Sequence, residues 1–306
     1  MAEIYHIPAM LSETIEGLAI KPDGIYVDVT FGGGGHSRAI LAKLHEMDNG
    51  QWTMDNGHLY SFDQDKDALS NAIDDERWTF VHSNFRYLRN WMDYYGVERI
   101  DGLLADLGVS FHHFDCPERG FSFRFPAPLD MRMNQTAKRT ASDIINSYNE
   151  EELARIFWLY GELKNGRQIA KNICKARSEK AIMRTEELVA ASRIPAERSK
   201  ELARLFQALR IEVNDELGAL REMLVAARDL LKPGGRIAIL TYHSLEDRLV
   251  KNFLRSGNLE GTIEKDFYGN ILTPFTLIEK GREASAEEVE RNPRSRSAKL
   301  RVAEKR

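Results

Sequence analysis

The sequence contains little cysteine and no long apolar run. Only Cys116 and Cys174 occur among 306 residues, and their separation does not match the spacing of metal ligands. This argues against a disulfide scaffold or a cysteine-rich zinc site and indicates a reducing compartment. No apolar stretch approaches the ~20 residues that a membrane helix needs. The first residues, Met1 to His6, lack the basic start and apolar core of a secretory signal, so we expect a cytoplasmic protein that engages no membrane.

The chain also lacks a strong net charge, but its charges are unevenly spread. The net charge is −4, whereas between His112 and Val213 basic side chains exceed acidic ones by four. The last sixteen residues hold seven basic side chains and one acidic side chain, Glu304. This asymmetry is compatible with a polyanionic partner, although solvated helix faces have a similar composition. No cluster of His, Cys, Asp or Glu has the spacing of metal ligands, so we expect no metal site.

The most informative stretch is a run of four glycines near the start of the chain. A short β-favouring segment, residues 25–29, leads into Gly32–Gly35, and a helical pattern follows at once. Strand, glycine turn and helix is the arrangement by which an α/β sheet presents backbone N–H groups and a helix N-terminus to a ligand. Because adjacent glycines cost backbone entropy on folding, we expect something to require the missing side chains.

Strands and helical segments alternate through most of the remaining sequence. Further strands are expected at residues 58–62, 78–82, 100–105 and 236–240, which predicts an α/β fold with a mostly parallel, doubly wound sheet. A terminal hairpin is expected from residues 272–278 and 298–302, with an irregular loop between them. From about residue 112 the strand pattern gives way to helical stripes. We therefore predict a core formed by residues 1–111 and 214–306, interrupted by an all-helical insertion, residues 112–213.

The glycine loop departs from two common nucleotide-binding patterns. A P-loop needs a lysine after its last glycine, where this chain has His36. A dinucleotide loop needs a sixth-position glycine, where this chain has Ser37. S-adenosylmethionine lacks a pyrophosphate and therefore remains compatible with this glycine loop. Asp63, at the end of the second strand, would accept hydrogen bonds from its ribose hydroxyls. Phe85, at the end of the third strand, would lie along the face of its adenine. Asp63 as part of a helix cap and Phe85 as a core residue are the structural alternatives.

Motifs along nearly the whole chain carry a family resemblance. They are Tyr5–Pro8, Asp28–Ser37, Asp106–Ser110, Glu118–Phe123, Pro128–Met133, Phe206–Asn214, His243–Arg248 and Asn292–Ser297. In this order they resemble the bacterial small-subunit ribosomal RNA cytosine-N4 methyltransferases, the RsmH (MraW) family. The resemblance implies a class I methyltransferase (Rossmann-like) core with a helical insertion for RNA recognition. It also implies S-adenosyl-L-methionine as cofactor.

The resemblance further implies methylation of N4 of a cytidine in the decoding region of 16S ribosomal RNA, within an assembled small subunit, and is compatible with a homodimer. By family analogy the cofactor contacts fall on Gly34, Gly35, His36, Asp63, Phe85 and Asp106. His113 occupies the place of a family glutamine, and a histidine can still make one hydrogen bond there. The local sequence from Ser110 to His113 departs from the usual Ser-Ser-x-Gln.

The cytosine amine needs an acceptor near it, because its lone pair is delocalised into the ring. Asp106, at the end of the fourth strand, is the best-placed carboxylate, as catalytic residue or as cofactor contact. Related amino-methyltransferases often have two prolines after this position, whereas Leu107-Gly108 follow here.

Substrate contacts are expected from polar and basic side chains elsewhere in the chain. His243 and Ser244 would hold the flipped base or its ribose; alternatively, Ser244 caps a helix with Asp247 as its N3 acid. Arg132 is expected to contact RNA phosphates, which position the nucleic acid rather than read its sequence. The same role is open to Arg124, Arg210, Arg291, Arg294, Arg296 and Arg301.

Three other functions remain as alternatives. A DNA amino-methyltransferase would be expected to show the acid-Pro-Pro-aromatic motif that is missing here. A catalytically silent RNA-binding factor would not need Gly32–Gly35, Asp63 and Asp106. An NAD-dependent oxidoreductase would need the missing sixth-position glycine.

Overall fold

The computed structural model describes residues 8–45, 57–108 and 116–306. The chain forms two compact units. The first comprises Met1–Gly108 and Gly218–Arg306, and the second comprises Val109–Leu217. No helix in the described part of the chain is both long and apolar enough to cross a membrane.

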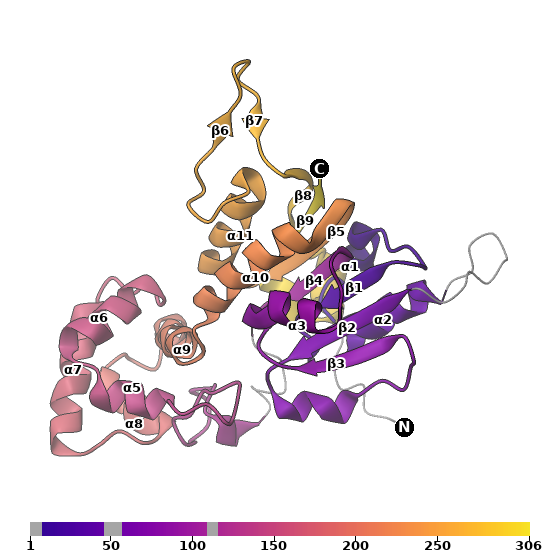
Figure 1. Cartoon of the computed structure of the whole chain (residues 1–306). Coiled ribbons are helices and arrows are strands. Elements are labelled where there is room, and N and C mark those ends of the chain that lie inside the picture. Colours follow the sequence, from indigo (N-terminus) through magenta and orange to yellow (C-terminus); the bar gives the residue numbers. More distant parts are fainter. Residues whose placement is uncertain (1–7, 46–56, 109–115) are drawn as a thin grey trace. The chain divides into compact units, whose positions relative to one another are not determined.

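The first unit is built on a seven-stranded sheet with the order β3-β2-β1-β4-β5-β9-β8 (Figure 1). Its strands are β1 (Ile25–Asp28), β2 (His58–Asp63), β3 (Trp78–His82), β4 (Ile100–Asp106), β5 (Leu231–Thr241), β8 (Phe275–Glu283) and β9 (Lys299–Lys305). Strands β1 to β5 are parallel, and β9 is antiparallel to both β5 and β8. This confirms the α/β, class I methyltransferase architecture. The strand order reverses between β1 and β4, and open α/β sheets bind ligands at the carboxyl ends of strands beside such a point.

Helices cover both faces of this sheet because side chains alternate along each strand. Val27 and Leu103 face a core that includes buried residues of three helices, whereas Tyr26 and Leu104 face the opposite core. The first core is covered by α3 (Leu88–Tyr94), α10 (Glu216–Leu230) and α11 (Ser244–Ser256), and the second by α1 (Leu11–Leu18) and α2 (Gly35–Leu44). The two cores hold the strands, and therefore their carboxyl ends, in fixed register.

Two local expectations for the last part of this unit were wrong. The connection between β8 and β9 is not irregular: it contains α12 (Ala286–Arg291) and the 3-10 helix η4 (Pro293–Ser297). Ser285 starts α12 by accepting a hydrogen bond from Glu288 N. Leu272 belongs to a separate small hairpin, β6 (Glu264–Lys265) with β7 (Ile271–Leu272).

The second unit is helical, with its own apolar core. It contains η3 (Pro117–Arg119), α5 (Ala141–Ser147), α6 (Glu150–Leu159), α7 (Gly166–Glu179), α8 (Thr185–Ser192) and α9 (Ser199–Asn214). A capping box starts α6, because Asn149 and Glu152 exchange side-chain to backbone hydrogen bonds. Leu153, Ile156 and Phe157 then turn one face of α6 into the core.

Candidate functional site

The glycine loop connects β1 to α2 at the carboxyl edge of the sheet. Gly32 and Gly34 have positive φ angles of 49° and 74°, a backbone conformation that glycine adopts without steric cost. A Cβ atom on Gly34 would lie 2.9 Å from the Phe31 ring, and one on Gly35 would lie 2.2 Å from Cγ of Pro8. Packing within the chain therefore already requires these two glycines. Gly34 is the N-cap of α2 and offers no side-chain acceptor, so first-turn N–H groups of α2 stay available to a ligand.

Asp63 ties this loop to the end of β2. Its Oδ2 accepts a hydrogen bond from Gly32 N at 2.8 Å, and its Oδ1 accepts one from Asp65 N at 2.8 Å. A carboxylate at the end of the second strand is the group that accepts hydrogen bonds from ribose hydroxyls in folds of this kind. Asp65 caps the following 3-10 helix η1 (Lys66–Asn71) by accepting a hydrogen bond from Asp67 N. Helix capping is thus assigned to Asp65, and Asp63 organises the loop.

Phe85 follows β3 as the first residue of the 3-10 helix η2 (Phe85–Tyr87). Its ring is partly buried against the core under α3 and α10. Asn84, just before it, caps η2 and donates a hydrogen bond to Gln64 Oε1 at 2.9 Å. This bond connects the ends of β2 and β3, so the structure places Phe85 and Asp63 at neighbouring strand ends.

Asp106 ends β4, and its carboxyl group lies against Tyr242 and His36. Its Oδ1 accepts a hydrogen bond from the Tyr242 hydroxyl at 2.6 Å, and its Oδ2 lies 3.7 Å from His36 Nδ1. Its backbone N–H donates to Thr30 Oγ1 at 2.6 Å, which fixes the end of β4 beside β1. Burial raises the pKa of Asp106 to about 7; the Tyr242 hydrogen bond opposes this rise, and the nearby charge of Glu246 adds to it. The group therefore changes charge near neutral pH.

His36 is buried in the first turn of α2, with an exposed fraction of 5%. Among the described residues its Nε2 has no hydrogen-bond partner. Burial lowers the pKa of His36, although the nearby Asp28 carboxylate opposes this shift. Asp28 is itself buried and accepts hydrogen bonds from Ser37 Oγ and Thr30 N, and burial raises its pKa. A neutral His36 offers one donor and one acceptor nitrogen, and its Nε2 is a buried polar atom with which a ligand can form a hydrogen bond.

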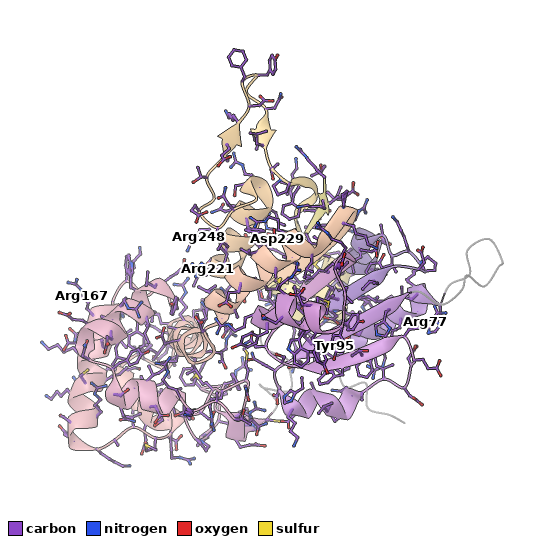
Figure 2. The ribbon with its side chains drawn as sticks, viewed as in Figure 1. Arg77, Tyr95, Arg167, Arg221, Asp229 and Arg248 are labelled. Atoms are coloured by element: carbon purple, nitrogen blue, oxygen red, sulfur yellow. The ribbon has the colours of Figure 1, made fainter. Side chains whose placement is uncertain are left out.

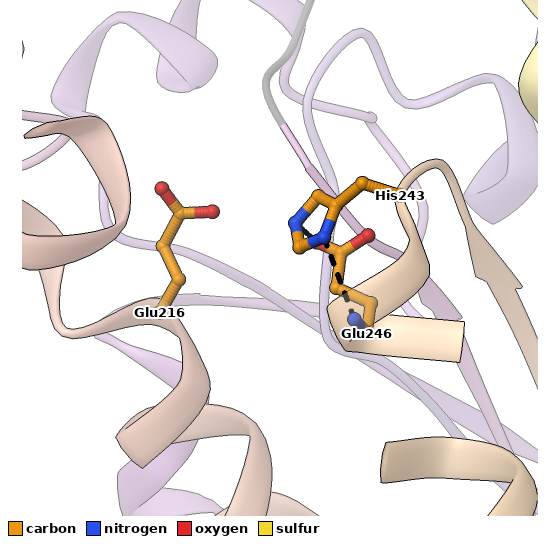
Figure 3. Close-up of side chains that lie close together, drawn as sticks. All are labelled: Glu216, His243 and Glu246. Atoms are coloured by element: carbon orange, nitrogen blue, oxygen red, sulfur yellow. Dashed lines mark hydrogen bonds and ion pairs between the residues drawn. The ribbon is translucent and has the colours of Figure 1, made fainter. Parts of the chain in front are cut away.

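His243 and Glu246 stand where β5 leads into α11 (Figure 3). The alternative role expected for Ser244, that of helix cap with Asp247 as N3 acid, is wrong. The N-cap is His243, whose Nδ1 accepts a hydrogen bond from Glu246 N at 3.4 Å. His243 Nε2 lies 3.1 Å from Glu246 Oε1. Asp247 instead pairs with Arg301, a predicted phosphate contact whose guanidinium is thereby engaged inside the unit.

For two of the predicted site residues, a place in this cluster stays a prediction. Arg132 lies in the helical unit, where both oxygens of Asp130 and the carbonyl of Ala137 accept hydrogen bonds from its guanidinium. Its role toward RNA stays a prediction. His113 lies outside the described residues.

Tyr242 joins β5 to β4 in this site through its bond to Asp106, a role that was not predicted from the sequence. Leu240 of β5 pairs with Asp106 of β4, so a residue two positions further along β5 stands at the same carboxyl edge. A polar aromatic residue directly after a buried strand was the available signal, but the pairing of β4 with β5 had to be known to use it.

Comparison with known proteins gives one consistent family. The sequence model of a family described as the MraW methylase family matches residues 3–306. A curated relative from Phocaeicola vulgatus, named ribosomal RNA small subunit methyltransferase H, is 58% identical over 308 residues, which cover 99% of this chain and 98% of the relative. A relative of the same name from Parabacteroides distasonis is 58% identical over 306 residues, with coverage of 98% and 97%.

Proposed function

The chain belongs to the MraW methylase family, and from this premise we propose that it methylates N4 of a cytidine in the decoding region of small-subunit (16S) ribosomal RNA. As a member of that family it is a methyltransferase with S-adenosylmethionine as its cofactor. The ribosomal RNA substrate is taken from the names of its relatives. The cytoplasm, the assembled subunit as substrate and a homodimer as active form belong to the same proposal.

The residues at the strand ends fit this cofactor. Asp63 places a carboxylate at the end of β2, where ribose hydroxyls can donate to it, and the buried Nε2 of His36 has no partner in the described part of the chain. Gly34 leaves first-turn N–H groups of α2 uncapped. We therefore assign the cofactor site to Gly34, Gly35, His36, Asp63, Phe85 and Asp106. When bound, S-adenosylmethionine supplies an electrophilic methyl group on a sulfonium centre.

The observation that carries the proposed reaction is the environment of Asp106. Tyr242 engages Oδ1, whereas Oδ2 accepts no hydrogen bond within the described ranges and lies 3.7 Å from His36 Nδ1. Oδ2 is therefore the oxygen that can accept a hydrogen bond from the cytosine amine. Acceptance raises electron density on N4 and provides a destination for its proton, and a group whose pKa is about 7 suits general base catalysis at neutral pH. His243, at the neighbouring strand end, would position the flipped base.

Methyl transfer to purified small subunits from cells that lack this protein tests the proposal. With labelled S-adenosylmethionine, the wild-type protein should produce labelled N4-methylcytidine in nucleoside analysis. Asp106→Asn should lower the rate by about 10² to 10⁴, the usual contribution of a general base. Label on another base would overturn the N4 assignment. Absence of label in small-subunit RNA at every assembly stage would overturn the substrate.

A further inference from the structure

The outer face of α7 in the helical unit carries a row of cations. Arg167, Lys171 and Lys175 are exposed and follow one another at four-residue intervals, so they project from one side of the helix. Arg167 lies at the surface of this unit in Figure 2. The structure gives none of the three an acidic partner within the residues it describes. The opposite face of α7 is held in the core by Ile169, Ala170 and Ile173, which leaves the row facing solvent.

The three cations destabilise the helix that carries them. Like charges four residues apart repel each other along a helix, and a cation in the first turn opposes the helix dipole. α7 has no acidic residue in its first turn and no side-chain N-cap. In contrast, α5, α6 and α8 of the same unit have acidic residues in their first turns, and α5 and α6 also begin with capping boxes. A polyanion bound along α7 would neutralise the row and remove this repulsion.

A groove of about 830 Å³ between α6 and the start of α7 adjoins the row. Trp158 lines it with 60% of its surface exposed, and Arg155, Lys164 and Arg167 line it as well. Glu150 and Glu151 form part of the lining at the first turn of α6, where they complement the helix dipole. An exposed indole among cations is the combination by which proteins hold single-stranded nucleic acid: bases stack on the ring and cations follow the backbone.

We propose that this α6–α7 surface binds an unpaired segment of the ribosomal RNA substrate. Arg167, Lys171 and Lys175 contact successive phosphates, and one base stacks on Trp158. The inference rests on the proposed function for the identity of the RNA. It adds an anchoring surface, formed entirely within the helical unit, that nothing in the methyl-transfer chemistry requires. Because stacking accepts any base, this surface contributes affinity and leaves the choice of cytidine to other residues.

Salt-dependent binding of a labelled single-stranded RNA oligonucleotide to the full-length protein tests the cationic row. Each phosphate contact contributes about 0.7 to the slope of log affinity against log salt for single strands. Lys171→Gln with Lys175→Gln should therefore reduce the slope by about 1.4. The matched control is Lys180→Gln with Arg198→Gln, which removes the same charge from exposed cations of this unit that already pair with Glu187 and Glu201. The control should retain the wild-type slope.

Trp158→Ala tests the stacking contact. It should weaken single-stranded RNA binding by about fivefold to hundredfold, the range for loss of one base–aromatic stack. Trp158→Phe should recover most of this loss, and binding of a blunt RNA duplex should not respond to either change. Circular dichroism of each variant checks folding, which the exposed position of Trp158 should preserve.

The outcomes separate this inference from the proposed function. If the wild type methylates small subunits but the row variant matches its control in slope and affinity, the α6–α7 surface is overturned while the enzyme assignment stands. If the substitutions in the α6–α7 surface weaken binding of a protein partner and leave RNA binding unchanged, the inference is also overturned. If no RNA is methylated yet the row variant and Trp158→Ala lose RNA binding as expected, the anchoring surface stands and the proposed reaction fails.

Discussion

The Tyr242 hydroxyl donates a hydrogen bond to Asp106 across the ends of β5 and β4, with 2.6 Å between the two oxygens. The bond favours the ionised carboxylate and so holds down a pKa that burial raises to about 7. The pKa of Tyr242 is raised well above its ordinary value by burial and by Asp106, so the tyrosine remains the donor throughout the physiological range.

Removal of this donor should change the pH dependence of the reaction. In Tyr242→Phe the pKa of Asp106 should rise further, and the acid limb of the pH profile for kcat/KM should move to higher pH by about one unit. Tyr94→Phe is the matched control, because Tyr94 is 75% exposed on α3. A Tyr242→Phe profile that coincides with that of the wild type would contradict a role of Asp106 as base.

Asp106 should also make stability depend on pH. Its pKa is higher in the folded protein, about 7, than its ordinary value of 3.8, so between these values the folded state holds a proton that the unfolded state releases. The free energy of unfolding therefore decreases as pH rises through this window and is constant above it. The side chain is 16% exposed, which reduces the effect below the full pKa difference.

Asp106→Asn removes this titration and keeps an acceptor for Tyr242. Urea unfolding should show the variant to be more stable than the wild type at pH 8, by on the order of 2 kcal/mol. The difference should shrink toward zero near pH 4. Because both proteins share Asp28 and His36, the comparison cancels their titrations to first order. Equal free energies of unfolding at pH 8 would show that ionisation of Asp106 does not destabilise the folded protein.

Asp63→Ala should weaken binding of S-adenosylmethionine by roughly tenfold to hundredfold, since charged hydrogen bonds contribute about 1.5 to 3 kcal/mol each. The ribose loses its acceptor, and Gly32 N loses the bond that holds the loop. Calorimetric titration measures the change. Asp93→Ala, which removes an exposed carboxylate paired with Arg89, should bind the cofactor like the wild type. Unchanged affinity in Asp63→Ala would exclude the ribose contact.

The cap of α11 gives a test of the corrected helix start. His243→Ala should lower the free energy of unfolding by about 1 kcal/mol through loss of the N-cap. Ser244→Ala, one residue later and already in the helix, should change it by less than about 0.5 kcal/mol. Urea unfolding of both variants decides the assignment, and a larger loss in Ser244→Ala would restore serine as the cap.

Strand positions depend on local periodicity and could be predicted from the sequence pattern. The strands at residues 58–62 and 78–82 were placed correctly within one residue. Asp63, Phe85 and Asp106 could be assigned to one edge because parallel strands end on the same side of a sheet. The cofactor itself came from the family resemblance together with these positions.

What could not be predicted depends on contacts between distant segments. The Tyr242–Asp106 bond requires the register of β4 with β5, which no local pattern contains. Arg301 was offered as an RNA phosphate contact, yet Asp247, 54 residues earlier in the chain, holds its guanidinium inside the unit. The glycines illustrate the same limit: Pro8 and Phe31 exclude side chains at Gly35 and Gly34, so packing within the protein accounts for part of what was attributed to a ligand.

The place of β9 in the sheet has a consequence for biosynthesis. β9 is translated after every other strand of the sheet, yet it lies between β5 and β8 rather than at an edge. A nascent chain that has emerged only as far as residue 298 would therefore expose the unpaired edges of both neighbours, a state prone to association with other chains. The core can close only when residues 299–305 leave the ribosome, so a premature stop codon shortly before this strand should yield a product that the cell degrades rather than a shortened enzyme.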